Sequence, residues 1–279
     1  MRGGERVVRV PPKLMAQSRA SARTRGKSDP IDALAVARAV LREPDLPVAA
    51  HDEGSRELKL LVDRREDLVG ERTRMVNRFR WHLHELDPHL DPSPTALNRA
   101  KTRARLAEQL TTHTGLVAEL ARDILADIDR ITQTINALEQ RISHRVEEQG
   151  AALIGIPGCG ALTAAKILGE TAGVARFRSE ACYARHAGVA PIPVWSGNTA
   201  GRVRMARSGN RQLNAALHRI AVTQIRLDGE GRRYYRKRLL TGDSTTEALR
   251  CLKRRLARVV YKTLQPSHET AAGLQPAAA

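Results

Sequence analysis

The sequence predicts a mainly α-helical protein with a long coiled-coil spacer and a small helical C-terminal domain. Two observations carry this prediction: apolar residues recur at alternating steps of four and three over 124–142, and glycine and other small residues become frequent after Gly150. The first pattern is that of a coiled-coil seam. We expect four regions, which are an N-terminal segment 1–50, a helical spacer 51–149, a compact domain 150–264 and a disordered tail 265–279.

The chain begins with short β-branched runs and two prolines, "GERVVRVPPKLM" over 4–15. This pattern predicts one strand that leaves a sheet. A flexible cationic loop is then expected over 16–28. Because a single strand is not stable alone, the rest of its sheet is expected either after residue 50, where no strand pattern occurs, or before Met1.

A helix is predicted from Asp29 to Glu43, in the stretch "GKSDPIDALAVARAV" and ahead of Pro44. With Asp29 as the N-cap residue, Pro30 and Asp32 take the first and third helical positions, where a carboxylate complements the positive helix end. Carboxylates one turn apart also share a helix face, and such hard oxygen ligands suit Mg²⁺. Two interpretations of Asp29 and Asp32 therefore stay open: they begin the helix, or they bind a metal ion.

The spacer contains two helical patterns separated by three prolines in 87–95. The first, over 56–86, is amphipathic, with arginines between its apolar positions. The second is the seam, formed by Ile124, Ile128, Ile131, Ile135, Leu138 and Ile142. An antiparallel hairpin within one chain and a rod that joins two chains fit this seam equally.

The charge of the chain indicates a polyanionic partner. Among 279 residues, 47 lysines and arginines stand against 30 acidic residues, which gives a formal net charge of +17. Nucleic acid is the expected partner. No apolar run or signal peptide predicts a membrane, so we expect a cytoplasmic protein. The three cysteines, Cys159, Cys182 and Cys251, are too far apart to indicate a disulfide framework or a zinc site.

The stretch "LIGIPGCGALTAAKIL" over 153–168 resembles a helix-hairpin-helix element. Gly158 and Gly160 would let backbone N–H groups approach a phosphate, and the following helix would present its positive end to the same anion. Such an element binds DNA without reading its sequence. A plain packing corner between two helices is the alternative.

A third stretch, "HAGVAPIPVWSGNTAGRVRMARSGNRQLNAAL" over 186–217, combines a serine in a proline-containing loop with several arginines. Ser196 precedes a glycine, and a serine that attacks phosphorus needs close approach and positive charge to stabilise the transition state. His186 and His218 are candidate bases by proximity in sequence alone. An ordinary turn at Ser196 is the alternative, and the arginines would still contact phosphates. The nucleic-acid-binding candidates of this stretch are Arg202, Arg204, Arg207, Asn210 and Arg211.

Taken in order, these stretches resemble the bridge-RNA-guided insertion-sequence transposases of the DEDD-plus-serine type, the IS one-ten group. The resemblance implies a RuvC-like domain of the ribonuclease H fold, a coiled coil and a C-terminal domain with a nucleophilic serine. It implies that Asp29 and Asp32 are the last two of four acidic metal ligands and that Ser196 becomes joined to DNA. It also implies multimers, dimers or tetramers, in which one subunit's acids act with another's serine, and a structured guide RNA that pairs with the DNA sites.

The position of the aspartates departs from the family pattern. The first two acidic ligands of the family lie well upstream of the aspartate pair, whereas 28 residues precede Asp29 here. We therefore expect residues 1–50 to be the C-terminal remnant of a truncated RuvC-like domain, with weak or absent strand cleavage and retained nucleic-acid binding.

Two functional hypotheses follow from these observations. The first is a magnesium-dependent DNA recombinase that uses Ser196. The second is a non-catalytic basic helix-hairpin-helix protein, which predicts salt-dependent binding without magnesium. A coiled-coil scaffold would leave the arginine-rich C-terminal half unexplained.

Overall fold

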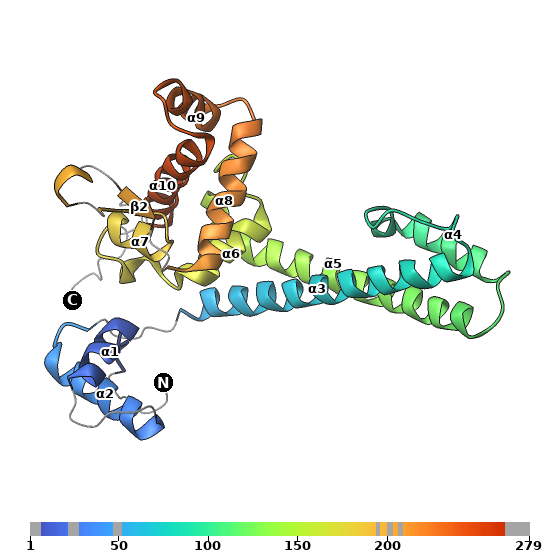
Figure 1. The fold of residues 1–279 in the computed structure, drawn as a ribbon, viewed down its shortest axis with the longest axis horizontal. Coiled ribbons are helices and arrows are strands. Elements are labelled where there is room, and N and C mark those ends of the chain that lie inside the picture. Colours follow the sequence, from blue (N-terminus) through green and yellow to red (C-terminus); the bar gives the residue numbers. More distant parts are fainter. Residues whose placement is uncertain are drawn as a thin grey trace, which may run out of the picture. The chain divides into compact units, whose positions relative to one another are not determined.

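The computed structural model describes residues 7–21, 28–46, 52–193, 196–199, 203–205 and 209–265. Most of these residues are helical, and the sheet formed by the described residues has two strands (Figure 1). The chain divides into two units, Met1–Asp52 and Glu53–Ala279. No helix among the described residues is long and apolar enough to span a lipid bilayer.

The first unit contains two helices, α1 (Pro12–Ala20) and α2 (Asp29–Arg42), which contact each other. Their buried residues are small: Ser18 in α1, and Ala35 and Ala39 in α2. Small side chains at a contact let two helices approach closely. This unit therefore depends on little apolar burial in its described part.

Helix α1 corrects the predictions for the N-terminal segment. Pro12 takes the first helical position, where its missing N–H needs no partner, and the residues after it are mostly good helix formers. The predicted loop is therefore wrong over 16–20, while 22–27 lie outside the described residues. Of the predicted strand, the described part retains a single bridge at Val8.

Helix α2 lies where it was predicted, but its N-cap is one residue earlier than the predicted Asp29. Its N-cap is Ser28, which has an extended backbone, so Asp29 and Pro30 take the first two helical positions. The helix ends at Arg42, within one residue of the expected end and ahead of Pro44. Both aspartates stay in the first turn.

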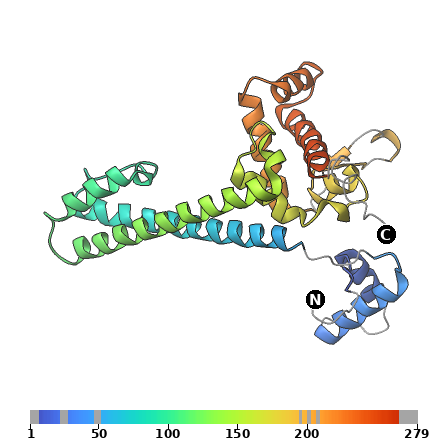
Figure 2. The ribbon, with the colours of Figure 1, turned by 180° about the vertical axis from the view of Figure 1, so that it is seen from behind.

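Two long helices, α3 (Glu53–Leu86) and α5 (Leu116–Ile154), form the spine of the second unit and lie side by side in both views (Figures 1 and 2). Ion pairs show that they are antiparallel, because Glu57 contacts Arg145 while Arg65, further along α3, contacts Glu139. The seam residues Ile128, Ile135 and Ile142 are buried. In this structure the seam thus pairs within one chain.

Each end of the α3–α5 pair carries its own apolar core. One core includes Phe79, Leu83, Leu110 and Ile128, and is completed by the short helix η1 (Ala96–Asn98) and α4 (Ala100–Leu110). The other core joins the opposite end of the pair to the C-terminal helices.

Gly150 marks the point at which α5 leaves its regular course. Its φ of −154° and ψ of 27° are not helical, and an added Cβ would lie 2.5 Å from Cδ1 of Leu168. Helix α6 (Ala161–Thr171) therefore packs against the bend. The change in composition that the sequence shows at Gly150 coincides with this bend.

The remaining elements surround one apolar core built on Tyr183, Leu213, Leu217, Leu256 and Val260. These elements are η2 (Val174–Arg176), α7 (Glu180–His186), β1 (Pro191–Pro193), η3 (Gly197–Thr199), β2 (Val203–Met205), α8 (Arg211–Arg226), α9 (Glu230–Leu240) and α10 (Thr245–Leu264). The predicted tail over 266–279 lies outside the described residues.

Candidate functional site

The aspartate pair lies at the N-terminal end of α2. Asp29 is exposed, and Asp32 lies one turn later. Arg19 of α1 donates a hydrogen bond from Nη1 to Oδ1 of Asp32 at 2.9 Å, with about a third of each side chain exposed (34% and 32%). This ion pair orients Asp32 and links the two helices of the first unit.

The two carboxylates on α2, those of Asp29 and Asp32, fit a metal site that has few protein ligands. Among the described residues, no three histidine, cysteine, aspartate or glutamate side chains lie close enough to share an ion. Mg²⁺ is usually bound through one or two carboxylates, with waters and substrate phosphates as its other ligands. Asp29 and Asp32 therefore suit a Mg²⁺ bound together with nucleic acid rather than one enclosed by protein.

The glycine turn between α5 and α6 contains Gly158 and Gly160, which have different surroundings. Gly158 has a φ of +84°, and an added Cβ would lie 3.0 Å from Cβ of Thr223 in α8. Gly160 is the exposed N-cap residue of α6, and an added Cβ would meet nothing within 4 Å. Gly158 thus serves packing on α8, whereas Gly160 keeps its backbone accessible to an anion at the helix end.

Ser196 lies in the connection of a β-hairpin. Strands β1 and β2 are antiparallel, with Pro191 opposite Met205 and Pro193 opposite Val203. Ser196 is exposed, as are Gly197 and Asn198 after it. The structure therefore presents the predicted nucleophile on an accessible turn, the serine hairpin, which spans 191–205.

The arginines predicted to flank Ser196 are described in part. Arg202 and Arg207 lie outside the described residues, and so does the side chain of Arg204, whose backbone pairs with Ile192. Arg211 is exposed at the first position of α8. It is the member of this set whose side chain the structure shows on the surface.

Asn210 closes the base of the serine hairpin. Its Oδ1 accepts a hydrogen bond from the Leu213 N–H at 2.9 Å, which caps α8. Its backbone N–H donates to the His186 carbonyl at 2.7 Å, and its Nδ2 donates to the Glu170 carboxylate. These contacts give Asn210 a structural role that the sequence prediction of a nucleic-acid contact did not include.

Glu170, at the end of α6, is the carboxylate that accepts the hydrogen bond from Asn210. Its side chain is only 9% exposed, and Lys59 of α3 pairs with the same carboxylate. Burial opposes ionisation of Glu170, but hydrogen bonds from Lys59 and Asn210 outweigh it, so its pKa lies below the ordinary value. Lys59, Glu170 and Asn210 thus form a charged chain from α3 to the hairpin base.

A second set of polar contacts fixes the segment that enters the hairpin. Nδ2 of Asn214 donates to the carbonyls of Ala187 and Gly188, both at 3.0 Å. Lys253 of α10 donates to Oδ1 of Asn214, and burial lowers the pKa of Lys253. Gly188 and Gly209 also approach so closely that an added Cβ on Gly209 would lie 2.7 Å from Cα of Gly188.

The two candidate bases have different surroundings. His186 ends α7, with its Nε2 3.0 Å from Nη2 of Arg176 and its ring 5.1 Å from that of Phe177. His218 is exposed on α8. His186 is therefore the one held at the hairpin base.

The Lys59–Glu170 pair was missed by the sequence analysis. The available signal was a pair of charges, Lys166 and Glu170, in an otherwise apolar and small-residue helix. At that spacing they suggest a surface pair within one helix. In the structure both charges turn to α3 instead, where Lys166 pairs with Glu66 and Glu170 with Lys59.

Two family models match the chain. The model described as "Transposase IS116/IS110/IS902 family" matches residues 150–236, which include the glycine turn and the serine hairpin. A second model, described as "Transposase" and of the DEDD IS110 type, matches residues 2–88, which include the aspartate pair.

Curated relatives align over most of the chain. An uncharacterized 42 kDa protein of insertion element IS900 from Mycobacterium paratuberculosis is 27% identical, over 94% of this chain and 77% of that protein. An uncharacterized 44.8 kDa protein of insertion element IS116 from Streptomyces clavuligerus is 26% identical, with the same coverage. The matches on both segments show that the chain carries transposase domains of the IS110/IS116/IS902 family.

Proposed function

We propose that this protein is a DNA transposase of an insertion sequence that cuts and rejoins DNA strands by serine attack on a phosphodiester. The observation that carries the proposal is the serine hairpin, which exposes Ser196 while partly buried hydrogen bonds hold the flanking residues Ala187 and Asn210. The hairpin lies within the segment that matches a transposase model.

The proposed reaction exchanges one phosphate ester for another. Oγ of Ser196 attacks phosphorus, an Oγ–P bond forms, and the P–O bond to the leaving strand breaks. The serine proton passes to a base, for which His186 and His218 are the candidates, and the leaving strand end gains a proton. Because the ester energy is kept in the serine adduct, a hydroxyl of another strand can reverse the step and rejoin the DNA.

The arginines of the same stretch supply positive charge to the reacting phosphate. Arg202, Arg204, Arg207 and Arg211 follow Ser196 closely in sequence. Guanidinium groups placed near a phosphoryl group stabilise the charge that develops in the transition state. We assign these residues to that role and to backbone contact with DNA.

Asp29 and Asp32 are the proposed ligands of Mg²⁺. When bound, the metal would supply positive charge to a phosphate oxygen. Both carboxylates lie in the first turn of α2, and Arg19 orients Asp32. Both aspartates lie in the segment that matches the DEDD-type model.

The finer assignments rest on the family resemblance and on the charge of the chain. They are a RuvC-like origin of the first unit, a structured guide RNA, a homo-oligomer whose subunits share sites, and action on DNA in the prokaryotic cytoplasm. The net charge of +17 supports an RNA and a DNA partner together. The alternative is a non-catalytic helix-hairpin-helix protein, which the accessible backbone at Gly160 would also serve.

The test of the nucleophile compares Ser196→Ala with Ser93→Ala, which removes an exposed hydroxyl from the α3–α4 connection. The full chain is incubated with Mg²⁺, a plasmid carrying its own element ends and the transcript beside the gene, and is then denatured and assayed for covalently attached DNA. We expect the adduct with the wild type and with Ser93→Ala, and a loss of roughly a thousandfold or more with Ser196→Ala. An adduct that persists in Ser196→Ala would disprove the assignment, and nucleic-acid binding without any wild-type adduct would favour the alternative.

The shared site is tested by mixing two inactive variants. A preparation of Ser196→Ala and one of Asp29→Asn/Asp32→Asn are each expected to lack recombination activity. If the acids of one copy act with the serine of another, a mixture regains part of the activity. A mixture as inactive as its components would contradict a site shared between copies.

A further inference from the structure

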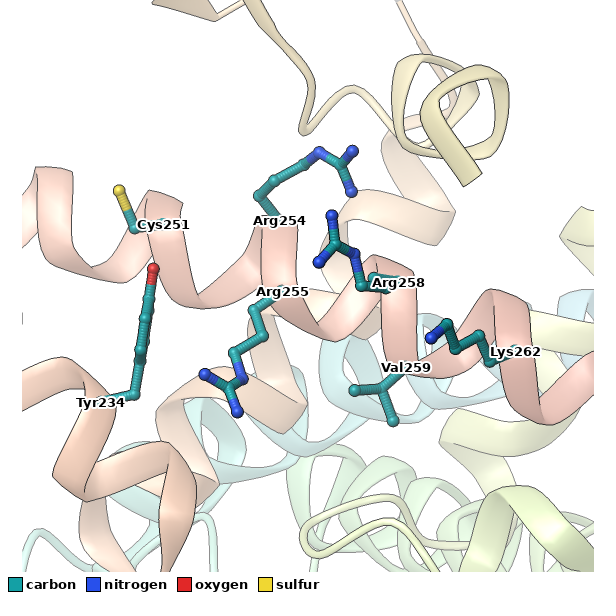
Figure 3. Close-up of a pocket in the computed structure, with 7 residues that line it drawn as sticks. All are labelled: Tyr234, Cys251, Arg254, Arg255, Arg258, Val259 and Lys262. Atoms are coloured by element: carbon teal, nitrogen blue, oxygen red, sulfur yellow. The ribbon is translucent and has the colours of Figure 1, made fainter. Parts of the chain in front are cut away.

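A basic pocket of about 580 Å³ lies between α9 and α10. Figure 3 shows the cationic side chains of α10 beside Tyr234 of α9. The residues that line it are Tyr234, Cys251, Arg254, Arg255, Arg258, Val259 and Lys262. Helix α10 lies beyond residues 2–88 and 150–236, so neither family match includes it.

The cations gather because α10 is amphipathic. Leu252, Leu256 and Val260 of α10 are buried in the core. Arg254, Arg258 and Lys262 recur at steps of four, which places a cation about every 6 Å along one face of the helix. The alternation of apolar and basic residues in the sequence of α10 therefore places a row of positive charge on one face of the helix.

A second pocket extends this row onto α9. It shares Tyr234 and Arg255 with the first and adds Glu230, Arg233, Lys237, Arg238 and Thr241. Arg238 is paired with Asp243 at 2.6 Å, so Arg233 and Lys237 are the cations that extend the row. We call the two pockets together the α9–α10 surface. It is continuous because Arg255 belongs to both.

The charges of the first pocket are only partly neutralised. Glu180 of α7 is shared by two guanidiniums, at 2.8 Å from Nη2 of Arg258 and 3.8 Å from Nη2 of Arg254. Glu230 lies 3.7 Å from Arg255, and both of those side chains are more than half exposed, so this pair is weak. Four cations thus stand against two carboxylates.

The position of Arg255 is fixed by an aromatic ring. Its guanidinium carbon lies 5.1 Å from the ring centroid of Tyr234, within cation–π distance. A guanidinium held in this way keeps its N–H groups available to a phosphate at a small entropic cost. The surface therefore offers oriented donors rather than only diffuse charge.

We propose that the α9–α10 surface binds the sugar-phosphate backbone of a nucleic acid without reading its sequence, as a contact separate from the serine hairpin. The inference rests on the proposed function, because it assigns a further contact to the same nucleic-acid partners. DNA and RNA share the required chemistry, so the experiment includes an arm for each.

The test compares two double variants that remove the same charge. Arg255→Gln/Lys262→Gln alters the surface, whereas the control Lys101→Gln/Arg141→Gln removes two exposed cations from α4 and α5. Binding of each full-length variant to duplex DNA and to single-stranded RNA is measured by fluorescence anisotropy over a range of salt concentrations. Thermal melting establishes that each variant is folded.

The expected result is a shallower salt dependence for the surface variant. Loss of two phosphate contacts reduces the slope of log K against log salt by roughly 1.8 for duplex DNA or 1.4 for single strands. A change with DNA alone or RNA alone identifies which of the two occupies the surface. The charge-preserving variant Arg255→Lys/Lys262→Arg should keep the wild-type slope if charge carries the binding.

Two results would overturn the inference in different ways. If the wild type binds and the surface variant matches the control with both nucleic acids, this surface is not a contact, while the proposed function stands. If the wild type binds neither nucleic acid, the proposed function fails and the inference fails with it.

A second readout uses the wild-type chain. Cys251 lines the pocket, so bound nucleic acid should slow its alkylation by N-ethylmaleimide. An unchanged rate at saturating DNA and RNA would also contradict the proposal.

Discussion

The aspartate helix α2 and the serine hairpin are held in place by different means. The aspartates occupy the first turn of a helix, and the described contact of their side chains with another element is one ion pair, Arg19–Asp32, whose partners are each about a third exposed (34% and 32%). The segments that flank the serine hairpin make partly buried hydrogen bonds, because Asn210 donates to Glu170 of α6 and Asn214 of α8 donates to the carbonyls of Ala187 and Gly188. Lys59 of α3 and Lys253 of α10 contact Glu170 and Asn214 in turn. The segments that flank the exposed hairpin are thus held against the core helices, whereas the aspartates lie on a surface helix turn.

This difference indicates how each region should respond to mutation. A carboxylate on an exposed helix turn adds little to stability, so changing it should affect function almost alone. A buried polar network contributes to folding as well, because each lost partner leaves another group unsatisfied. Stability measurements can therefore separate the two regions before any activity is assayed.

The largest stability effect is expected in the glycine turn that packs against α8. Gly158→Ala places a Cβ on a residue with φ of +84° and 3.0 Å from Thr223, so it should lower the free energy of unfolding by about 2–4 kcal/mol. Gly160→Ala, with open space around it, should change it by less than about 0.5 kcal/mol. Urea denaturation measures both.

A measurement of nucleic-acid affinity distinguishes the roles of the two glycines further. If Gly160 approaches a phosphate, Gly160→Ala should weaken binding without loss of stability. Equal stability losses at the two glycines would contradict the packing role of Gly158.

The hairpin network is tested by Glu170→Ala. The variant leaves the Asn210 amide without its acceptor and removes one of the two carboxylates that pair with Lys59, and we expect a loss of about 2 kcal/mol. Glu148→Ala is the control, because Glu148 is half exposed and pairs with Arg145 on the surface. If both variants lose the same small amount, the network does not brace the hairpin.

The pH dependence of this network has a definite sign. Hydrogen bonds from Lys59 and Asn210 hold the pKa of Glu170 below its ordinary value of 4.5, despite opposing burial. The stabilisation is therefore present above about pH 4.5 and is lost as pH falls through the lower folded-state value. The difference in unfolding free energy between the wild type and Glu170→Gln should shrink below pH 4.5, and a difference that grew on acidification would refute this account.

A small stability effect is expected for Asp32→Asn. Because both partners of the Arg19–Asp32 pair are about a third exposed, its loss should cost no more than about 1 kcal/mol. Recombination activity should nevertheless fall sharply if Asp32 binds Mg²⁺. A large loss of stability would show that the first unit depends on this pair more than its exposure suggests.

Local patterns in the sequence were sufficient for several features. The helix over 29–43 and the first spacer helix over 56–86 follow from apolar spacing and proline positions, and the structure confirms both within a few residues. The seam over 124–142 lies within a longer helix, α5, which extends beyond it at both ends. The N-terminal segment was mispredicted because Pro11 and Pro12 were taken as the end of a strand, whereas Pro12 begins a helix. Proline signals a boundary in both cases, and the pattern alone does not say which element follows.

The sequence by itself determined the helical spacer, the basic charge and the order of aspartates, glycine turn and serine, because these depend on residues near one another in the chain. Only the tertiary structure decided that the α5 seam pairs with α3 of the same chain, that Asn210 faces Glu170, and that Lys59 reaches a carboxylate 111 residues away. Such pairings depend on which helix faces become neighbours. Packing of the whole unit sets that choice, and no local pattern records it.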